Sequence, residues 1–409
     1  MNAPLDIAAI QSQFPILQRE MEGRRIVYLD NAATSQTPQR VVDAITDAYT
    51  HYKANVHRGV HTLSVEATEH MELTRRRVAA YINAPGSDCI VFTRGTTEAI
   101  NLVASSYGAL LSDGDEVIVT QMEHHANIVP WQLLSHRKAI SIKVAPLHPD
   151  GTLDLAALER LFTPATRLVA VAHVSNVLGT VNPVKAIADM AHRHGARILI
   201  DGAQAVAHQA VDVTDIDADF YAFSAHKMYG PTGVGVLYAK RELLEAMPPY
   251  QGGGEMIGHV RLDGGTTWAD VPYKFEAGTP DFIDIAAFSS ALDFIEEVGI
   301  DRIERHGREL GAYAAELLSR IDGLTIYGTA EAKAPVIAFN VAGAHHYDVG
   351  MLLDRLGVAV RTGHHCAQPL MDYYGIEGTI RASFAIYNTR DDADALAAAL
   401  TRILPLLRH

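Results

Sequence analysis

The sequence has 409 residues, of which 48% are hydrophobic and 20% are charged, a balance typical of a globular protein with a large core. Its net charge of −14 argues against binding to the phosphate backbone of nucleic acids as the main task. The chain has only 2 cysteines, Cys89 and Cys366, which excludes a disulfide framework and a cysteine-based zinc site.

No apolar run approaches the ~20 residues that a membrane helix needs. The N-terminus, MNAPLDIAAIQSQF, lacks the basic start and apolar core of a secretory signal. Few cysteines favour a reducing compartment, so we expect a cytoplasmic protein without a membrane partner.

From residue 88 onward, short runs rich in valine and isoleucine alternate with helix-like stretches. The runs are CIVFT, EVIVT, RLVAVAHV, ARILID, FYAFS and VGVLYA. Strands that are buried on both faces have this continuous apolar pattern, which predicts a mostly parallel sheet covered by helices. Between the runs, LDLAALERLF and VKAIADMAHRHG have helical spacing, and Gly195 is expected to cap the second helix.

The glycine-rich region 252–278 interrupts this alternation and predicts an irregular excursion or a hairpin. After it, IAAFSSALDFIEEVG begins a long helical stretch, and the C-terminal part predicts a separate small α+β unit. Its final helix should begin after Thr389, with Asp391 and Asp392 at the positive N-terminal end. One face of that helix is apolar and carries Leu396, Leu400, Ile403, Leu404 and Leu407.

Three polar positions lie where predicted strands end, the place at which open α/β sheets bind ligands. Lys227 follows FYAFS; lysine is usually a solvated surface charge, but a desolvated lysine is a candidate for a Schiff base. Asp201 ends ARILID, and its carboxylate either pairs with a pyridinium nitrogen or caps a helix. Thr96, in FTRGTTEAIN, begins a helix whose amides can bind phosphate, although threonine is also an ordinary cap.

Together these positions resemble the cofactor site of the fold-type I pyridoxal phosphate enzymes. The motifs are similar to those of the aminotransferase class V family and, within it, of the SUF-type (group II) cysteine desulfurases. The resemblance runs nearly the full length of the chain, through YLDNAATSQTP, NVHRGVHTLS, EHHANIVPW and RTGHHCAQPLM.

The resemblance implies an α/β fold with a large domain and a small α+β domain. The large, cofactor-binding domain would span residues 25–290 and contain a mostly parallel seven-stranded sheet flanked by helices. The small domain would combine residues 1–24 with residues 291–409 and carry the catalytic cysteine loop. A homodimer with one pyridoxal 5'-phosphate per subunit is the implied assembly.

The resemblance also implies roles for individual residues. Lys227 would hold the cofactor covalently and remove the Cα proton of the substrate, and Asp201 would bond the ring nitrogen. His124 would stack on the ring and take part in proton transfer, whereas we expect its neighbour His125 to be structural. The other implied cofactor contacts are Gln204, Thr96, Ser224 and His226, and, from the other subunit of the dimer, Gly278 and Thr279.

Three residues are implied for substrate binding. Arg381, in TIRASF, matches the arginine that binds the substrate carboxylate, a task that suits a planar guanidinium. Asn176 matches a second carboxylate contact. Arg361 either shapes the cysteine loop or contacts the sulfur acceptor.

Cys366, in RTGHHCAQP, is the implied nucleophile. A thiol of pKa ~8.5 is already a good nucleophile at neutral pH. In the family this cysteine attacks the sulfur of L-cysteine and becomes a persulfide, and alanine is released. We expect Cys89, in contrast, to be a small buried hydrophobe.

The implied destination of the sulfur is an acceptor protein for iron–sulfur cluster assembly. The segment around Cys366 lacks the long flexible insertion of the other desulfurase group, which fits an enzyme that needs a dedicated sulfur acceptor. The sequence leaves open whether this acceptor is SufE-like or SufU-like; we favour a SufE-like one, together with a SUF scaffold. Selenocysteine would be a second substrate.

Other functions fit parts of the pattern. His364, His365 and Cys366 could suggest a metal site, but three adjacent residues rarely converge on one ion. A cofactor-free sulfur carrier or iron–sulfur scaffold would need Cys366 but not Lys227. A selenocysteine lyase is the nearest enzyme alternative, followed by sulfinate- or kynurenine-cleaving relatives. Many relatives have asparagine after AGTP, where this chain has Asp281 and Phe282, which leaves the local dimer contact open.

Overall fold

The computed structural model describes residues 5–21 and 23–407. Residues 1–4, 22 and 408–409, which belong to the predicted small domain, lie outside the described part of the chain. None of the helices in the described part combines the length and the apolar character needed to cross a membrane.

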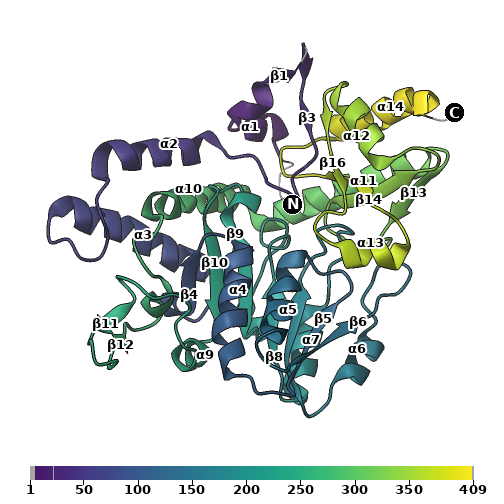
Figure 1. Cartoon of the computed structure of the whole chain (residues 1–409). Coiled ribbons are helices and arrows are strands. Elements are labelled where there is room, and N and C mark those ends of the chain that lie inside the picture. The colour runs from purple at the N-terminus through teal and green to yellow at the C-terminus, as the bar shows by residue number, and fades with distance from the viewer. Residues whose placement is uncertain (1–4, 22, 408–409) are drawn as a thin grey trace.

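The largest sheet has seven strands in the order β4-β10-β9-β8-β7-β5-β6 (Figure 1). β10 runs antiparallel to both of its neighbours, and the other neighbouring strands are parallel. The predicted mostly parallel sheet is therefore confirmed. Its strands are β4 (Ile90–Thr93), β5 (Glu116–Thr120), β6 (Ser141–Ala145), β7 (Thr166–Ala172), β8 (Arg197–Asp201), β9 (Phe220–Ser224) and β10 (Gly235–Ala239).

Successive residues of the central strands face two different cores. In β8, Ile198 and Ile200 belong to one core and Leu199 to the other, because side chains alternate across a sheet. Burial on both faces explains the continuous apolar runs of the sequence. The edge strand β6 was not predicted, since half-exposed side chains such as Val144 break that pattern.

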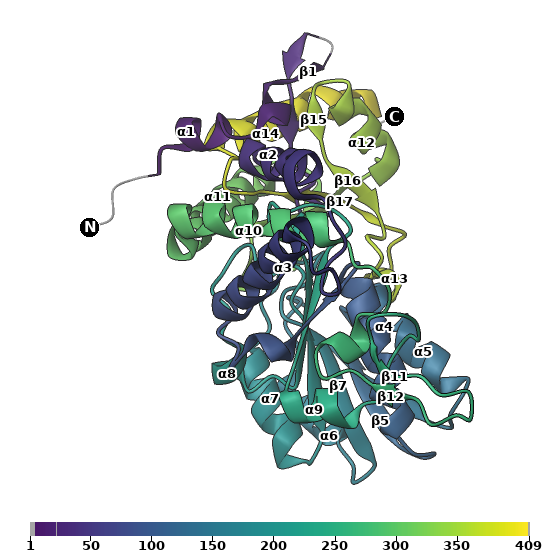
Figure 2. The same ribbon diagram turned by 90° about the vertical axis from the view of Figure 1, so that its left-hand side faces the viewer.

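Helices cover both faces of the sheet. One core includes residues of α4 (Thr96–Ser106), α5 (Val129–Ser135) and α9 (Arg241–Ala246). The other includes residues of α6 (Leu155–Leu161), α7 (Val184–Arg193), α8 (Val213–Ile216) and α10 (Phe282–Val298). Outside α10 lie α2 (Gln39–Asp47) and α3 (Thr62–Tyr81), which pack against it (Figure 2).

The predicted helices and hairpin are present. α6 and α7 match the helical stretches, but the C-cap of α7 is His194, and Gly195 follows it at a φ of +75°, the left-handed conformation that closes many helices. The region 252–278 forms a hairpin of β11 (Ile257–His259) and β12 (Thr267–Trp268).

A second, antiparallel sheet has four strands in the order β13-β14-β17-β16. Helix α14 packs its predicted apolar face against the core of this unit: of the five residues predicted for that face, Leu407 is partly buried and the other four are buried. The position of the boundary between the two domains stays a prediction. The elements of this part are α11 (Ile300–Ser319), β13 (Leu324–Tyr327), β14 (Val336–Val341), α12 (His346–Asp354), β16 (Arg361–Gly363), α13 (Gln368–Tyr374), β17 (Thr379–Ser383) and α14 (Arg390–Leu407).

The N-terminal segment joins the C-terminal unit. β3 (Val27–Tyr28) pairs in parallel with β15 (Val358–Ala359), and Asp30 forms a bridge to Ser383 of β17. Asp30 is thereby held beside the second sheet. The remaining short elements are α1 (Ile7–Gln11), β1 (Glu20–Met21) and β2 (Arg24–Arg25).

Candidate active site

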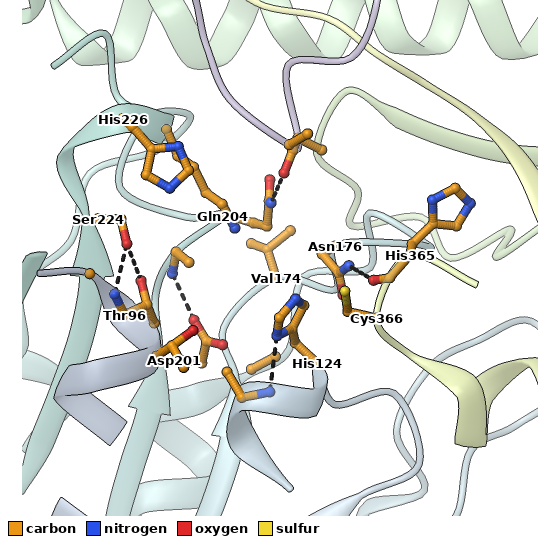
Figure 3. Close-up of a pocket in the computed structure, with 18 of the residues that line it drawn as sticks. Thr96, His124, Val174, Asn176, Asp201, Gln204, Ser224, His226, His365 and Cys366 are labelled. Atoms are coloured by element: carbon orange, nitrogen blue, oxygen red, sulfur yellow. Dashed lines mark hydrogen bonds between the residues drawn. The ribbon is translucent and has the colours of Figure 1, made fainter. Parts of the chain in front are cut away.

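A cavity of about 670 Å³ collects residues from the carboxyl ends of the seven-stranded sheet and from the second sheet (Figure 3). Every predicted site residue lines it except Gly278 and Thr279. Those that it brings together are Thr96, His124, Asn176, Asp201, Gln204, Ser224, His226, Lys227, Arg361, Cys366 and Arg381.

Lys227 ends a short 3-10 helix, Ala225–Lys227, that directly follows β9. Burial lowers the pKa of its ammonium group, although the carboxylate of Asp201 acts in the opposite direction. The lysine is therefore biased toward the neutral amine, the form that reacts with carbonyl groups.

Asp201 is the last residue of β8 and is buried, and burial raises the pKa of its carboxyl group. Its Oδ1 accepts a hydrogen bond from the backbone N–H of Ala203 at 3.0 Å. Gln204, one turn further, donates from Nε2 to the carbonyl of Ala32 at 2.6 Å. Both side chains line the cavity, because β8 ends there at Asp201 and the chain continues directly to Gln204.

The N-terminus of α4 lies beside the end of β9. The Ser224 hydroxyl accepts a hydrogen bond from the backbone N–H of Thr96 at 2.7 Å, and the two hydroxyl oxygens lie 2.6 Å apart. The close approach requires glycine in β10, because a Cβ on Gly235 would lie 2.3 Å from the Cα of Gly95. Amides and hydroxyls at the start of a helix form a favourable site for an anionic group.

Two histidines of the cavity are held neutral. Burial, and then the charge of Lys227, lowers the pKa of His124 and of His226 to about 4. His124 Nδ1 accepts a hydrogen bond from the N–H of Ala126 at 3.0 Å, so its ring proton resides on Nε2.

Arg381 reaches the cavity from β17 with only 2% of its surface exposed. It donates from Nη1 to the carbonyl of Asn176 at 2.9 Å and from Nη2 to Asp30 Oδ1 at 3.0 Å. Among the described residues, its buried Nε has no hydrogen-bond partner. Arg361 is half exposed, and its Nε lies 3.4 Å from Asp30 Oδ2. The arginine pair thus retains an unused donor for an anionic ligand.

Cys366 lies in a tight turn between β16 and α13 and is partly buried. Asn176 donates from Nδ2 to the carbonyl of His365 at 2.8 Å, which ties the turn to the cavity. The adjacent histidines diverge: His365 is buried against Thr379, whereas the exposed His364 accepts a hydrogen bond from the Cys366 N–H. Cys89 is buried before β4, as predicted.

Gly278 and Thr279 lie outside this cavity. They line an adjacent cavity of about 520 Å³, which shares Arg94, Glu98 and Tyr250 with the first one. Their role toward a second subunit stays a prediction. The neighbouring Asp281, unusual in the sequence pattern, caps α10 by accepting a hydrogen bond from the N–H of Asp284 at 3.3 Å.

Three further residues lie beside the cavity; the sequence predicts a structural role for His125 and does not single out Asp30 or Glu123. Asp30 pairs with Arg381, and His125 contacts the cysteine turn at two points on the C-terminal side of Cys366, the carbonyl of Cys366 and the N–H of Gln368. Glu123 is buried between Thr120, Asn127 and the N–H of Ala172, and burial raises its pKa to about 7. Asp30 and Glu123 both lie within motifs that had been noted, but their partners are distant in sequence.

The chain matches the family model of aminotransferase class-V over residues 27–396. The cysteine desulfurase of Salmonella dublin is 53% identical over 402 residues, which cover 98% of this chain and 99% of that relative. The cysteine desulfurase CsdA from Escherichia coli has a TM-score of 0.92 at 42% identity, covering 99% of this chain and 100% of that one. The apo cysteine desulfurase from Thermococcus onnurineus NA1 has a TM-score of 0.94 at 37% identity, covering 100% of both chains.

Proposed function

The chain belongs to the aminotransferase class-V family, and we propose that it is a pyridoxal-phosphate-dependent cysteine desulfurase. It would convert L-cysteine to L-alanine and retain the sulfur as a persulfide on Cys366. One observation carries the proposal: a thiol, a lysine biased toward its neutral form and an unused arginine donor line a single cavity. The full-length similarity to cysteine desulfurases supports it.

The donor set of the cavity fits pyridoxal phosphate. The amine of Lys227 suits condensation with an aldehyde, and the hydroxyls and amide at the start of α4 suit a phosphate. A protonated ring nitrogen would offset the burial that raises the pKa of Asp201. When bound, the cofactor supplies an electron sink that makes the bonds at the Cα of an amino acid labile. Its remaining contacts would come from His124, Gln204 and His226.

The residues of the chain would divide the other tasks. Arg381 and Asn176 bind and orient the substrate carboxylate, and Lys227 removes the proton from Cα. Because the ring proton of His124 resides on Nε2, His124 can give a proton to the carbon skeleton of the substrate as alanine forms.

Cys366 would act as the sulfur acceptor. Its thiolate attacks the sulfur of the substrate, so that an S–S bond forms while the C–S bond breaks. The electron pair of the broken bond goes to the substrate carbon, which a proton then converts to the methyl group of alanine. Cys366 is left as a persulfide, and no external oxidant is needed.

The short segment that carries Cys366 limits how sulfur can leave the cavity. β16 ends at Gly363 and α13 begins at Gln368, so Cys366 has little slack to carry sulfur away from the cavity. A partner must therefore bring its own thiol to the turn, and we favour a SufE-like rather than a SufU-like acceptor within a SUF assembly system. Such a protein should raise the rate of alanine formation, and a variant without its acceptor cysteine should not.

The active form would be a homodimer, in which Gly278 and Thr279 complete the phosphate site of the other subunit. Light scattering of the holoenzyme should give the mass of two chains. Selenocysteine should also be accepted, because selenium leaves carbon more readily than sulfur does.

The function is tested by incubating purified holoenzyme with L-cysteine and a thiol reductant. Alanine and sulfide in equal amounts are expected. Pyruvate and ammonia in place of alanine would indicate elimination and overturn the proposal. A preference for selenocysteine with no turnover of L-cysteine would favour a selenocysteine lyase instead.

A further inference from the structure

The turn that carries Cys366 has a left-handed backbone. His365 and Cys366 have φ values of +52° and +56°, and the N–H of Ala367 donates to the carbonyl of His364 at 2.8 Å to close the turn. Neither residue is glycine, so each position costs roughly 1–2 kcal/mol of backbone strain. Such a conformation persists only where surrounding contacts over-determine it.

The first half of the turn is fixed from the cavity side. The ring of His365 lies 2.9 Å from the Thr379 hydroxyl through Nε2, and the His365 carbonyl accepts the amide of Asn176. These contacts hold His365 and the carbonyl of the peptide group before Cys366, but they leave the peptide groups after Cys366 to other partners.

His125 supplies those partners on the C-terminal side. Its backbone N–H donates to the carbonyl of Cys366 at 2.7 Å. Its ring Nε2 accepts a hydrogen bond from the N–H of Gln368 at 3.1 Å. On the other side, the Cys366 N–H donates to His364 Nδ1 at 3.1 Å, and the two histidine rings lie 5.6 Å apart between centroids.

The contact through the ring requires a neutral imidazole. Nε2 can accept a backbone N–H only when it carries no proton. Burial, and then the charge of His364, lowers the pKa of His125, which favours this form at neutral pH. His124 is the other titratable ring nearby, at 6.3 Å between centroids.

The elements packed around His125 contribute few further charges. α5 has no charged residue, α4 carries only Glu98, α13 carries only Asp372 and β7 carries only Arg167 at its start. Within its own segment, Glu123 is buried two residues earlier. Protonation of His125 therefore acts chiefly on its own hydrogen bond to Gln368.

We infer that His125 is a positioning residue, whose neutral ring holds the left-handed turn so that Cys366 faces the cavity. This inference rests on the proposed function, because it assigns His125 to the sulfur-transfer step of the same site. As the pH falls through the lowered pKa of His125, Nε2 gains a proton, the bond to Gln368 is lost and the turn loosens.

Two substitutions of His125 separate the effect of its hydrogen bond to Gln368 from the effect of its protonation. His125→Leu fills the same space without an acceptor, whereas His125→Gln restores an acceptor that does not titrate near neutral pH. Gln121→Ala is the matched control, because Gln121 joins the same two segments through the carbonyl of Pro369 and touches neither peptide group of Cys366.

Amide hydrogen exchange of the holoenzyme measures the stability of the turn directly. In His125→Leu, the amide of Gln368 should lose about five- to tenfold of its protection, the effect of one neutral hydrogen bond. His125→Gln and Gln121→Ala should keep it. Between pH 7 and pH 5, after correction for intrinsic exchange, protection should fall in the wild type and stay constant in His125→Gln.

Kinetics of alanine formation give the second readout. His125→Leu should lower kcat about tenfold or more with KM for L-cysteine nearly unchanged, because misplacing a reactive group slows the reaction without affecting the carboxylate contact. His125→Gln should recover most of kcat. It should also remove the part of the fall in kcat at acidic pH that protonation of His125 causes. Wild-type kcat and unchanged Gln368 protection in His125→Leu would overturn the inference.

Failure of the inference is distinguishable from failure of the proposed function. If the wild type forms no alanine, the proposed function fails, and the assignment of His125 to sulfur transfer fails with it even if exchange at Gln368 responds. If the wild type forms alanine and neither readout responds to His125→Leu, only the role of His125 is refuted.

Discussion

Asp30 and Arg381 form an ion pair of 3.0 Å between the N-terminal segment and β17. Arg381 is 2% exposed, and Asp30 is its only acidic partner in the described part of the chain. The pair holds the guanidinium while Nε stays available. Asp30 therefore orients the residue that we assign to the substrate carboxylate.

Asp30→Ala should destabilise the protein strongly. Removing the carboxylate leaves a buried cation unpaired, which costs about 3–5 kcal/mol. Asp30→Asn keeps an acceptor and should lose less. Urea unfolding of both variants checks the order, and KM for L-cysteine should rise in both. Equal stabilities of the alanine variant and the wild type would contradict this assignment.

Arg381→Lys should impair substrate binding more than cofactor binding. Lysine keeps the charge but lacks the planar fork, so the substrate carboxylate loses a hydrogen bond to a charged group, worth about 1.5–3 kcal/mol. KM should rise roughly 10- to 100-fold, with the cofactor absorbance retained. Arg361→Lys is the comparison, and because Arg361 is half exposed its effect should be smaller. A larger effect for Arg361 would reverse the two roles.

Lys227→Ala should abolish covalent retention of the cofactor. In the wild type, borohydride reduction should fix pyridoxal phosphate to the peptide that contains Lys227, because the neutral amine favoured by burial forms a Schiff base. Mass spectrometry of the digested protein identifies the modified residue. Modification of another lysine, such as the partly buried Lys240, would show that the site is wrongly assigned.

Glu123 should make stability depend on pH. Its pKa is raised from an ordinary 4.5 to about 7, so the folded state keeps the proton while the unfolded state loses it. The stabilisation that Glu123 gives to the folded state is fully present below about pH 4.5. It is lost as the pH rises toward 7, which lowers the free energy of unfolding by up to about 3 kcal/mol. Glu123→Gln removes this dependence. Urea unfolding at pH 5 and pH 8 should show a larger decline for the wild type; parallel declines would exclude Glu123.

Much of the fold could be predicted because its signals are local. Strands such as β8 are buried on both faces, and their continuous apolar runs are visible in the sequence. β6 lacked that signal because an edge strand exposes side chains such as Val144. The strand-end rule likewise predicted where Asp201 and Lys227 would lie.

Contacts between distant segments could not be predicted from those signals. Asp30 and Arg381 are far apart in the sequence, and their ion pair exists only because β3, β15 and β17 assemble one unit from both ends of the chain. The left-handed turn at Cys366 carries no glycine or asparagine, the residues that signal this conformation. Its stabilising contacts come from Asn176 and His125.

The most direct test of the central claim compares wild type with Cys366→Ala during single turnover with L-cysteine. The wild-type peptide that contains Cys366 should gain one sulfur atom as alanine is released. The variant should release no alanine while it keeps the cofactor absorbance, because the chemistry at Lys227 is intact. Buried Cys89 should stay unmodified in both. Alanine formation by Cys366→Ala at the wild-type rate would contradict the account.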